Sequence, residues 1–600
     1  MIRPVFAIWL AVPLALSQAP ARDLPVNRPV PGTASISGIV LADDTDARPL
    51  RRVRVFLNSS DDEVARTTIS DDAGRFAFDG LRAGRYTLGG TKEGYVTVNY
   101  GARRADGAGA AVALAEGQAL SDMTLRLPRG AVITGVLLDP DGQPIPGVSM
   151  RALRYVYTAS GERRLRPITT TMASHITDDR GIYRIFGLAA GEYAIAAPAA
   201  LPLSTDGEIL LMNDAEVRRA MDEVRRYQRQ QTAVNGETAS SSGTDADAPR
   251  AIGYAPVFYP GTTAPSQAAM IPVGRGEERT GVDFQLQYVP MSSIRGSVIA
   301  PPEVPPDAIN LHLIATSDVI VSGSNNESRA TSVTAKGEFS FANVAPGSYT
   351  IVAKGTRGIP VPGPIFWATT DVVIEGQSEP GLTLSLQPGL TVSGRAVFEG
   401  STPRPDPSRL HVTLVPVLST SQVSLAGTPS RVDPAGRFTI TGITAGKYRL
   451  QASIAGSPAW MLAASSVNGR DALDVPVDLR QNVDGAVVTF TDRPGEVSGI
   501  VRDSSGKSIS GHPVILFSVD RTLWTPMSRR IRAVTSAVDG TFRVRMVPPG
   551  EYGLAAPPDV DDGEWYDPVF LERLLATSAV RTTIAEGEKK SLDLVATVAR

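Results

Sequence analysis

A motif of two glycines and one tyrosine recurs five times along this chain of 600 residues. The second glycine follows the first by 10 residues and the tyrosine follows by 12, with no insertion in any copy. The copies begin at Gly74, Gly181, Gly337, Gly436 and Gly540. Their tyrosines lie 107, 156, 99 and 104 residues apart, a period too long for a solenoid or a propeller blade. The repeat therefore predicts a string of independently folded domains of about 100 residues.

Each copy has the pattern of two short strands joined by a turn. In the first copy, Phe76 and Phe78 alternate with polar or small residues, which is the period of a half-buried strand. Polar turns such as SDDAG precede the first glycine, and their aspartates are expected to cap their own backbone. An AG or PG turn includes the second glycine, which we expect to adopt a positive φ.

The repeated tyrosine is predicted to be structural. We expect its ring to pack in the core and its hydroxyl to reach a backbone group, because a catalytic tyrosine would not need to recur in five domains. The five tyrosines are Tyr86, Tyr193, Tyr349, Tyr448 and Tyr552.

Further strands flank every copy. Upstream segments such as ISGIV and VSGIV begin at Ile36, Ile133, Ile294, Val392 and Val497, and a charged glycine turn introduces a closing strand downstream. About seven short strands per unit, with frequent turns, are typical of an antiparallel β-sandwich. The predicted fold is all-β, with about five tandem sandwiches of Ig-like or transthyretin-like type. The predicted boundaries are 33–128, 129–288, 289–388, 389–493 and 494–600.

Two segments interrupt the β pattern. Residues 205–250 form an insert in the second sandwich, where a helix beginning near Asn213 precedes a flexible Gly- and Ser-rich stretch. In the fifth sandwich, Pro568 after Asp567 starts a short helix. Its predicted apolar side consists of Phe570, Leu571, Leu574 and Leu575.

The N-terminus indicates export. Residues 1–21 combine an early arginine, a short apolar core and small residues for cleavage, as in a secretory signal peptide. No later segment approaches 18 apolar residues, so we expect no membrane span in the mature chain. The chain has no cysteine and a net charge of -3, which excludes disulfides and gives no sign of nucleic-acid binding. The expected location is periplasmic, extracellular or at the cell surface.

The second repeat resembles a known family. The segments GVLLDPDGQPIPGVSMRAL and TDDRGIYRIFGLAAGEYAI are similar to the carboxypeptidase regulatory-like domain, an Ig-like sandwich also grouped with the starch-binding-like fold. The other repeats keep the hairpin, and the fifth also keeps most of the first loop. This resemblance implies a fold rather than an activity, because such sandwiches are widely reused. The matching positions are Gly135, Asp139, Gly142, Pro144, Gly147, Asp178, Gly181, Tyr183, Gly191 and Tyr193.

The residues offer no catalytic constellation. None of the four histidines begins a His-x-x-Glu pair, and neither His-Glu-x-x-His nor Gly-x-Ser-x-Gly occurs. The prediction is a non-enzymatic protein without a cofactor. Acidic turns at Asp43, Asp44 and Asp46, or at Asp71 and Asp72, could hold calcium, but solvated turns are the favoured interpretation.

Two functions remain open. The favoured one is a structural or interaction scaffold of the bacterial envelope, with envelope proteins or polysaccharides as partners. The alternative is carbohydrate binding, because sugar-binding modules stack exposed aromatic rings on pyranose faces beside carboxylates. Hydrophobic bracing between sandwiches is the competing interpretation of the tryptophans. The candidate stacking residues are Trp565, Tyr566, Asp567, Tyr259 and Trp460.

Overall fold

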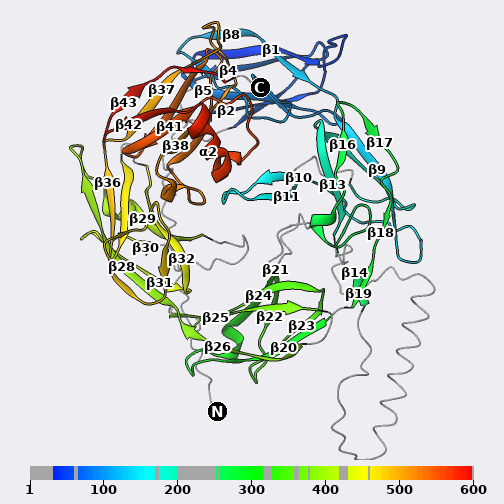
Figure 1. Cartoon of the computed structure of the whole chain (residues 1–600), viewed down its shortest axis with the longest axis vertical. Helices are drawn as coiled ribbons and strands as arrows, with labels where there is room; N and C mark the ends of the chain where they lie inside the picture. Colours follow the sequence, from blue (N-terminus) through cyan, green and yellow to red (C-terminus); the bar gives the residue numbers. More distant parts are fainter. Residues whose placement is uncertain are drawn as a thin grey trace, which may run out of the picture.

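The chain is built almost entirely from β-strands, grouped into five units of two packed sheets (Figure 1). Each unit has its own apolar core between the sheets, so the predicted class of tandem β-sandwiches is confirmed. The predicted signal peptide and insert helix lie outside the described residues. The computed structural model describes residues 32–59, 65–168, 175–198, 252–254, 256–290, 292–315, 328–356, 364–375, 379–417, 430–456 and 460–597.

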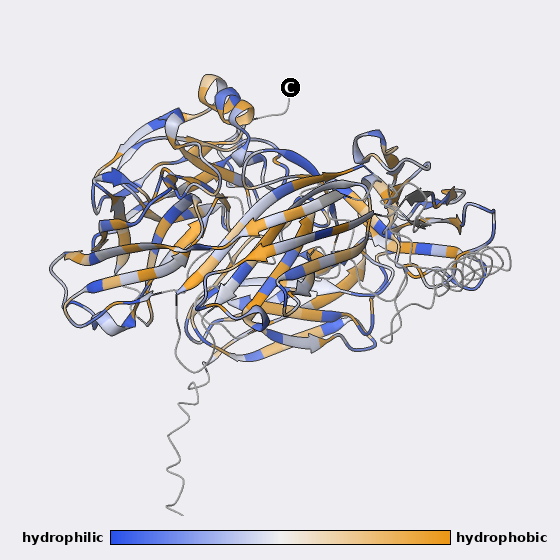
Figure 2. Cartoon of the chain, turned by 90° about the horizontal axis from the view of Figure 1, so that it is seen from below, coloured by the Kyte–Doolittle hydropathy of each residue, from blue (hydrophilic) through white to orange (hydrophobic). Residues whose placement is uncertain are grey.

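The first unit pairs its strands in the orders β4-β1-β8 and β3-β2-β5-β6, and β7 also pairs with β5. Buried and exposed side chains alternate along β4, as the sequence pattern predicted. Figure 2 shows this alternation of apolar and polar residues on strands across the molecule. The strands are β1 (Ala34–Ala42), β2 (Arg54–Ser59), β3 (Arg66–Ile69), β4 (Arg75–Leu81), β5 (Gly84–Thr91), β6 (Val98–Asn99), β7 (Val112–Leu114) and β8 (Ala119–Leu127).

The second unit has one sheet of order β12-β9-β17, in which β18 also pairs with β9. Its other sheet has the order β11-β10-β13-β15, and β16 also pairs with β13. The strands β14 and β19 form a separate pair. The elements are β9 (Ala131–Leu138), β10 (Arg151–Tyr157), β11 (Arg163–Pro167), β12 (Ile182–Leu188), β13 (Gly191–Ala197), β14 (Ile252–Tyr254), β15 (Val257–Phe258), η1 (Pro265–Gln267), β16 (Ile271–Val273), β17 (Glu278–Arg279), β18 (Phe284–Gln285) and β19 (Tyr288–Pro290).

The third unit has the orders β23-β20-β26 and β22-β21-β24-β25-β27, and the fourth has β31-β28-β36-β33-β34 and β30-β29-β32-β35. The third contains β20 (Ser292–Ile299), η2 (Pro306–Ala308), β21 (Ile309–Ala315), β22 (Ser328–Ser332), β23 (Glu338–Val344), β24 (Gly347–Thr356), β25 (Ile365–Ile374), β26 (Glu379–Ser385) and β27 (Gln387–Pro388). The fourth contains β28 (Leu390–Glu399), η3 (Pro407–Arg409), β29 (Leu410–Pro416), β30 (Ser430–Arg431), β31 (Arg437–Ile443), β32 (Gly446–Ile454), β33 (Met461–Val467), β34 (Arg470–Asp471), β35 (Val477–Leu479) and β36 (Val483–Thr491).

The fifth unit has the orders β40-β37-β43, with β44 also on β37, and β39-β38-β41-β42. Its helix begins where predicted, after the cap Asp567, and its buried residues pack on the outer face of the second sheet. No helix in the described part of the chain is long and apolar enough to cross a membrane. The elements are β37 (Gly495–Arg502), β38 (Pro513–Ser518), η4 (Arg521–Leu523), β39 (Ile531–Thr535), β40 (Thr541–Val547), β41 (Gly550–Ala555), η5 (Glu564–Tyr566), α2 (Pro568–Thr577), β42 (Val580–Ile584), β43 (Lys589–Ser591) and β44 (Leu594–Val595).

The repeated tyrosine closes the same corner in every unit. Each hydroxyl donates to the carbonyl four residues earlier, at 2.8 to 3.0 Å, as in the bond from Tyr448 to Thr444. Four of the five rings are buried and Tyr349 is half-buried. The prediction of a structural tyrosine bonded to backbone is therefore confirmed.

The first glycine of the motif adopts the left-handed backbone conformation. All five copies have φ between 70° and 84° there, in turns capped by side chains such as Asp71 and Asp178. The second glycine has positive but nearly extended φ, 154° to 159°, at Gly347, Gly446 and Gly550. The tight turn that demands glycine thus lies before the first strand of the hairpin.

A third glycine, in the first strand of every unit, permits a close backbone approach. The first strand pairs antiparallel with the hairpin and parallel with the closing strand, so the sandwiches are not antiparallel throughout. A Cβ on any of these glycines would lie 1.8 to 2.3 Å from a carbonyl oxygen of the closing segment. Only glycine therefore fits the position. The five are Gly38, Gly135, Gly296, Gly394 and Gly499.

The five units follow one another around a ring (Figure 1). The fifth unit lies beside the first, where the Val538 N–H donates to the carbonyl of Ala111 at 3.3 Å and Arg104 forms an ion pair with Asp561 at 2.7 Å. Contacts between residues 457 positions apart thus bring the last unit of the series against the first.

A buried carboxylate joins the fourth unit to the fifth. Asp474 is 4% exposed and accepts from Arg529 at 2.6 Å and from Arg530 at 2.7 Å. Burial alone would raise the pKa of Asp474, but the hydrogen bonds and charges of the two arginines lower it. Arg529 also donates to the carbonyls of Leu462 and Ala463, so this contact is held by several charge-assisted bonds.

Backbone and indole hydrogen bonds join three other pairs of units. Trp367 is 5% exposed and donates from Nε1 to the Gly442 carbonyl at 2.8 Å, so it braces the third unit against the fourth. Between the first two units, the Gly130 N–H donates to the carbonyl of Gly94 at 3.0 Å. Between the second and fifth, the Met527 N–H donates to the carbonyl of Ala159 at 3.0 Å.

Replacing the corner tyrosine is expected to weaken one unit. Tyr448→Ala removes a buried ring, which costs about 3 kcal/mol or more for large aromatic side chains. Tyr448→Phe keeps the ring and loses the hydrogen bonds of the hydroxyl with the carbonyl and the side-chain oxygen of Thr444, worth roughly 1 kcal/mol each. Protease protection followed unit by unit should fall in the fourth unit, more for Ala than for Phe. Equal loss in all five units would show that the ring unfolds as one body.

The first-strand glycine gives a second stability test. Gly499→Ala places a Cβ 1.8 Å from the Leu592 carbonyl oxygen, so β37 and the closing segment must separate. Overpacking of this kind typically costs about 1–3 kcal/mol. Hydrogen exchange should quicken in β37, β43 and β44. Gly381→Ala is the control, because an added Cβ there meets nothing within 4 Å; similar exchange in both variants would contradict the argument.

Candidate functional site

The predicted stacking residues do not form one surface. Trp460 is 6% exposed, lies edge-on to Phe398 with ring centroids 5.2 Å apart, and donates from Nε1 to the Pro403 carbonyl at 3.3 Å. The prediction of an exposed stacking ring is wrong for Trp460, because its ring fills the core of the fourth unit.

Tyr259 belongs to a different unit and also packs inward. Its half-buried ring lies edge-on to Phe284, with centroids 6.2 Å apart, against the core of the second unit. Part of the Tyr259 side chain is therefore buried against this core.

Trp565, Tyr566 and Asp567 lie together at the start of α2. Asp567 Oδ1 accepts from the Val569 N–H at 2.9 Å, so this carboxylate caps the helix. Trp565 and Tyr566 are half-buried beside the apolar cluster under α2, with ring centroids 6.1 Å apart. Of the five predicted residues, Trp565 lines a cavity between units.

We name this space the junction cavity, because the first, second and fifth units meet there. It has two adjoining lobes of about 480 and 520 Å³, which share the side chains of five lining residues. Ligand pockets commonly have volumes of about 300–1,000 Å³. The shared residues are Arg103, Arg104, Asp106, Arg154 and Tyr155.

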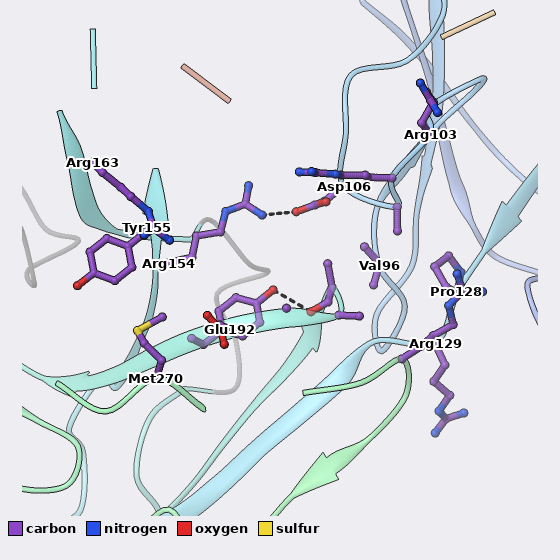
Figure 3. A pocket seen from close by; sticks show the side chains of 17 residues that line it. Val96, Arg103, Asp106, Pro128, Arg129, Arg154, Tyr155, Arg163, Glu192 and Met270 are labelled. Carbon is purple, nitrogen blue, oxygen red and sulfur yellow. Dashed lines mark hydrogen bonds and ion pairs between the residues drawn. The ribbon is translucent and has the colours of Figure 1, made fainter. Parts of the chain in front are cut away.

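The first lobe, which we name the arginine lobe, lies between the first two units (Figure 3). Six arginines and two carboxylates line it, together with Tyr155, Tyr193 and Met270. Figure 3 shows Arg154 reaching across to Asp106, with Glu192 nearby. Burial raises the pKa of Tyr193 to about 12, so its hydroxyl stays protonated at neutral pH. The six arginines are Arg103, Arg104, Arg129, Arg154, Arg163 and Arg275.

The second lobe, which we name the tryptophan lobe, lies between Trp565 and the wall shared with the arginine lobe. Its charges nearly balance, because three arginines face four aspartates. Arg104 pairs with Asp559 and Asp561, and both pairs are partly exposed. Apolar side chains of β38 and β39, including Ile515 and Val534, complete the lining.

A buried histidine supports the wall. Arg103 donates to Nδ1 of His512 at 2.7 Å and to the Pro558 carbonyl at 2.8 Å. Nδ1 must therefore accept, which leaves the proton on Nε2, 3.2 Å from the Ala556 carbonyl. Burial, and then the charge of Arg103, lowers the pKa of His512, so the neutral form is favoured. Sequence reasoning missed this residue because its partner lies 409 positions away.

The acidic turns considered for calcium have protein partners. Asp43 pairs with Arg275 at 2.7 Å and Asp44 with Arg48 at 3.2 Å. Asp71 Oδ1 accepts backbone N–H groups in its own turn. Within the described ranges, no three His, Asp or Glu side chains are grouped so as to hold a metal ion.

The solved structures that match this chain include streptococcal pilus proteins. A Streptococcal ancillary pilin is 17% identical, with 51% of this chain and 99% of that chain covered and a TM-score of 0.19. The pilus protein RrgB from Streptococcus pneumoniae is 8% identical, and the match covers 78% of this chain and 98% of that chain with a TM-score of 0.15. At these scores the likeness adds nothing on function. A comparison with curated proteins finds no match.

The family comparison bears on the first unit. Residues 35–128 match the model of the carboxypeptidase regulatory-like domain, over the stretch that contains β1 to β8. The corner tyrosine Tyr86 and the close-approach glycine Gly38 both lie in this match. The first unit of the chain is therefore a carboxypeptidase regulatory-like domain, the family that the motifs of the repeats resemble.

Proposed function

We propose that this chain is a non-enzymatic, exported scaffold of the bacterial envelope or the extracellular space. The observation that carries the proposal is the ring, in which the fifth unit contacts the first, second and fourth. Such contacts join five small sandwiches into one frame that can present several binding surfaces together. The proposed domains keep the boundaries 33–128, 129–288, 289–388, 389–493 and 494–600.

The motif residues support a structural role. The tyrosines bond their own corners and the glycines permit turns and close strand approach, so the features that recur serve the fold. Envelope proteins and polysaccharides are the proposed partners.

Carbohydrate binding is the second candidate function, and the tryptophan lobe favours it. Trp565 offers a half-buried indole beside Asp562 and the guanidinium of Arg104, which can accept and donate hydrogen bonds to sugar hydroxyls. An aromatic face combined with a few polar groups is typical of small-molecule sites.

The scaffold proposal predicts a closed shape in solution. Five sandwiches end to end would span roughly 200 Å, taking about 40 Å for each 100-residue domain of radius of gyration about 13 Å. Small-angle X-ray scattering should give a clearly smaller maximum dimension for the native chain. Arg103→Ala with Arg104→Ala removes contacts between the first and fifth units and should increase it.

A matched control for the scattering experiment lies on the same unit. Arg48→Ala with Arg51→Ala removes two exposed arginines whose partners are within the first unit, and should leave the scattering profile unchanged. A native profile already as long as the open string would contradict the scaffold proposal.

The carbohydrate candidate predicts saturable binding on a glycan array. Trp565→Ala should abolish it, because stacking on the indole is lost. Trp524→Ala is the control, since Trp524 is also half-buried beside the cluster under α2 but donates to the Ser518 carbonyl within its own unit. Binding that survives in the Trp565 variant would refute this candidate.

A further inference from the structure

We infer that the junction cavity binds an acidic oligosaccharide, with a sugar ring against Trp565 in the tryptophan lobe and a carboxylate group in the arginine lobe. The inference deepens the carbohydrate candidate above and rests on it. It combines three observations: the charge of the arginine lobe, the charge balance of the tryptophan lobe and the wall that the two share.

The arginine lobe holds more positive charge than its protein partners neutralise. Three of its arginines have carboxylate partners, Arg154 with Asp106, Arg104 with Asp559 and Asp561, and Arg275 with Asp43. These pairs use the charges of half of the arginines. The other half are Arg103, Arg129 and Arg163.

Arg103, Arg129 and Arg163 have no carboxylate partner among the described residues. Arg103 donates to an imidazole and a carbonyl, and the Arg163 guanidinium lies 4.5 Å from the centre of the Tyr155 ring. The Arg129 side chain is exposed. Glu192 is the one carboxylate of this lobe besides Asp106, so a net positive charge remains. Guanidinium groups bind carboxylates with two parallel hydrogen bonds, which makes a carboxylate the fitting ligand group.

The tryptophan lobe determines what else the ligand carries. Its four aspartates outnumber its three arginines, so a second anionic group there would meet Asp559, Asp561 and Asp562. A polyanion such as a nucleic-acid strand is therefore disfavoured. A sugar ring is neutral, stacks on an indole and offers hydroxyls to carboxylates. The ligand that satisfies both lobes has a neutral ring at one end and an acid at the other.

The wall shared by the two lobes places the proposed carboxylate site beside the proposed sugar-ring site. Arg103, Arg104, Arg154 and Tyr155 line both lobes, so the two lobes lie side by side and a ligand that extends over this wall contacts the same side chains from either lobe. Their ion pairs and hydrogen bonds hold the wall in place, which reduces the ordering cost of binding. An oligosaccharide of a few residues matches two lobes of about 480 and 520 Å³ better than a single sugar does.

Titration calorimetry of the full chain with an aldotriouronic acid, in which one glucuronate is joined to two neutral xylose rings, tests the inference. The methyl ester of the same trisaccharide is the matched neutral ligand, because it keeps the rings and removes the one charge. We expect the acid to bind about tenfold more tightly or better, as for the gain of one charge-assisted hydrogen-bond pair. Arg129→Gln with Arg163→Gln should reduce that preference to about twofold or less.

The control variant separates a site from general attraction. Arg437→Gln with Arg480→Gln removes the same charge from exposed side chains of the fourth unit and should leave the preference intact. A preference lost equally in both variants would overturn the inference. Equal affinity for acid and ester would overturn it while leaving carbohydrate binding standing. Binding of neither ligand, together with a blank glycan array, would overturn both.

Discussion

The approach of two backbones at one glycine is the constraint on which every unit of this ring depends. The first strand lies between the hairpin and the closing segment, and at Gly394 an added Cβ would lie 2.1 Å from the Ala486 carbonyl oxygen. The parallel pairing places the end of the closing strand beside the end of the first strand, as where Leu127 lies opposite Ala42. The chain therefore leaves each sandwich at the end of the sheet opposite to the one where it entered, which allows sandwiches to follow one another (Figure 1).

The closure of the ring concentrates charge at the junctions. Exposed ion pairs contribute little to stability, but Asp474 with Arg529 and Arg530 is buried, and removal of one partner would leave an uncompensated charge. The first and fifth units meet through Arg103 and Arg104, which also form the wall of the junction cavity. The residues that close the ring and the residues that shape the cavity are thus partly the same.

The sequence predicted what depends on neighbours in the chain. The turn caps, the tyrosine bonded to backbone and the helix after Asp567 are all local, and the structure confirms them. The exposure of a tryptophan is not local: Trp460 in SPAWMLA and Trp565 in GEWYDP both lie in segments with the pattern of a loop, yet one fills a core and the other lines a cavity. The arginine lobe was missed because its charges come from separate units.

The same geometry links ligand binding to ring closure. The walls of the junction cavity come from three units, so a ligand that contacts Trp565 and the arginine lobe together binds only when the fifth unit lies beside the first two. A ligand that binds one state and not another stabilises that state in proportion to its concentration over its dissociation constant. An acidic oligosaccharide would therefore hold the ring closed, and a ring already closed by Arg104 and Asp561 would bind it without first having to order the wall.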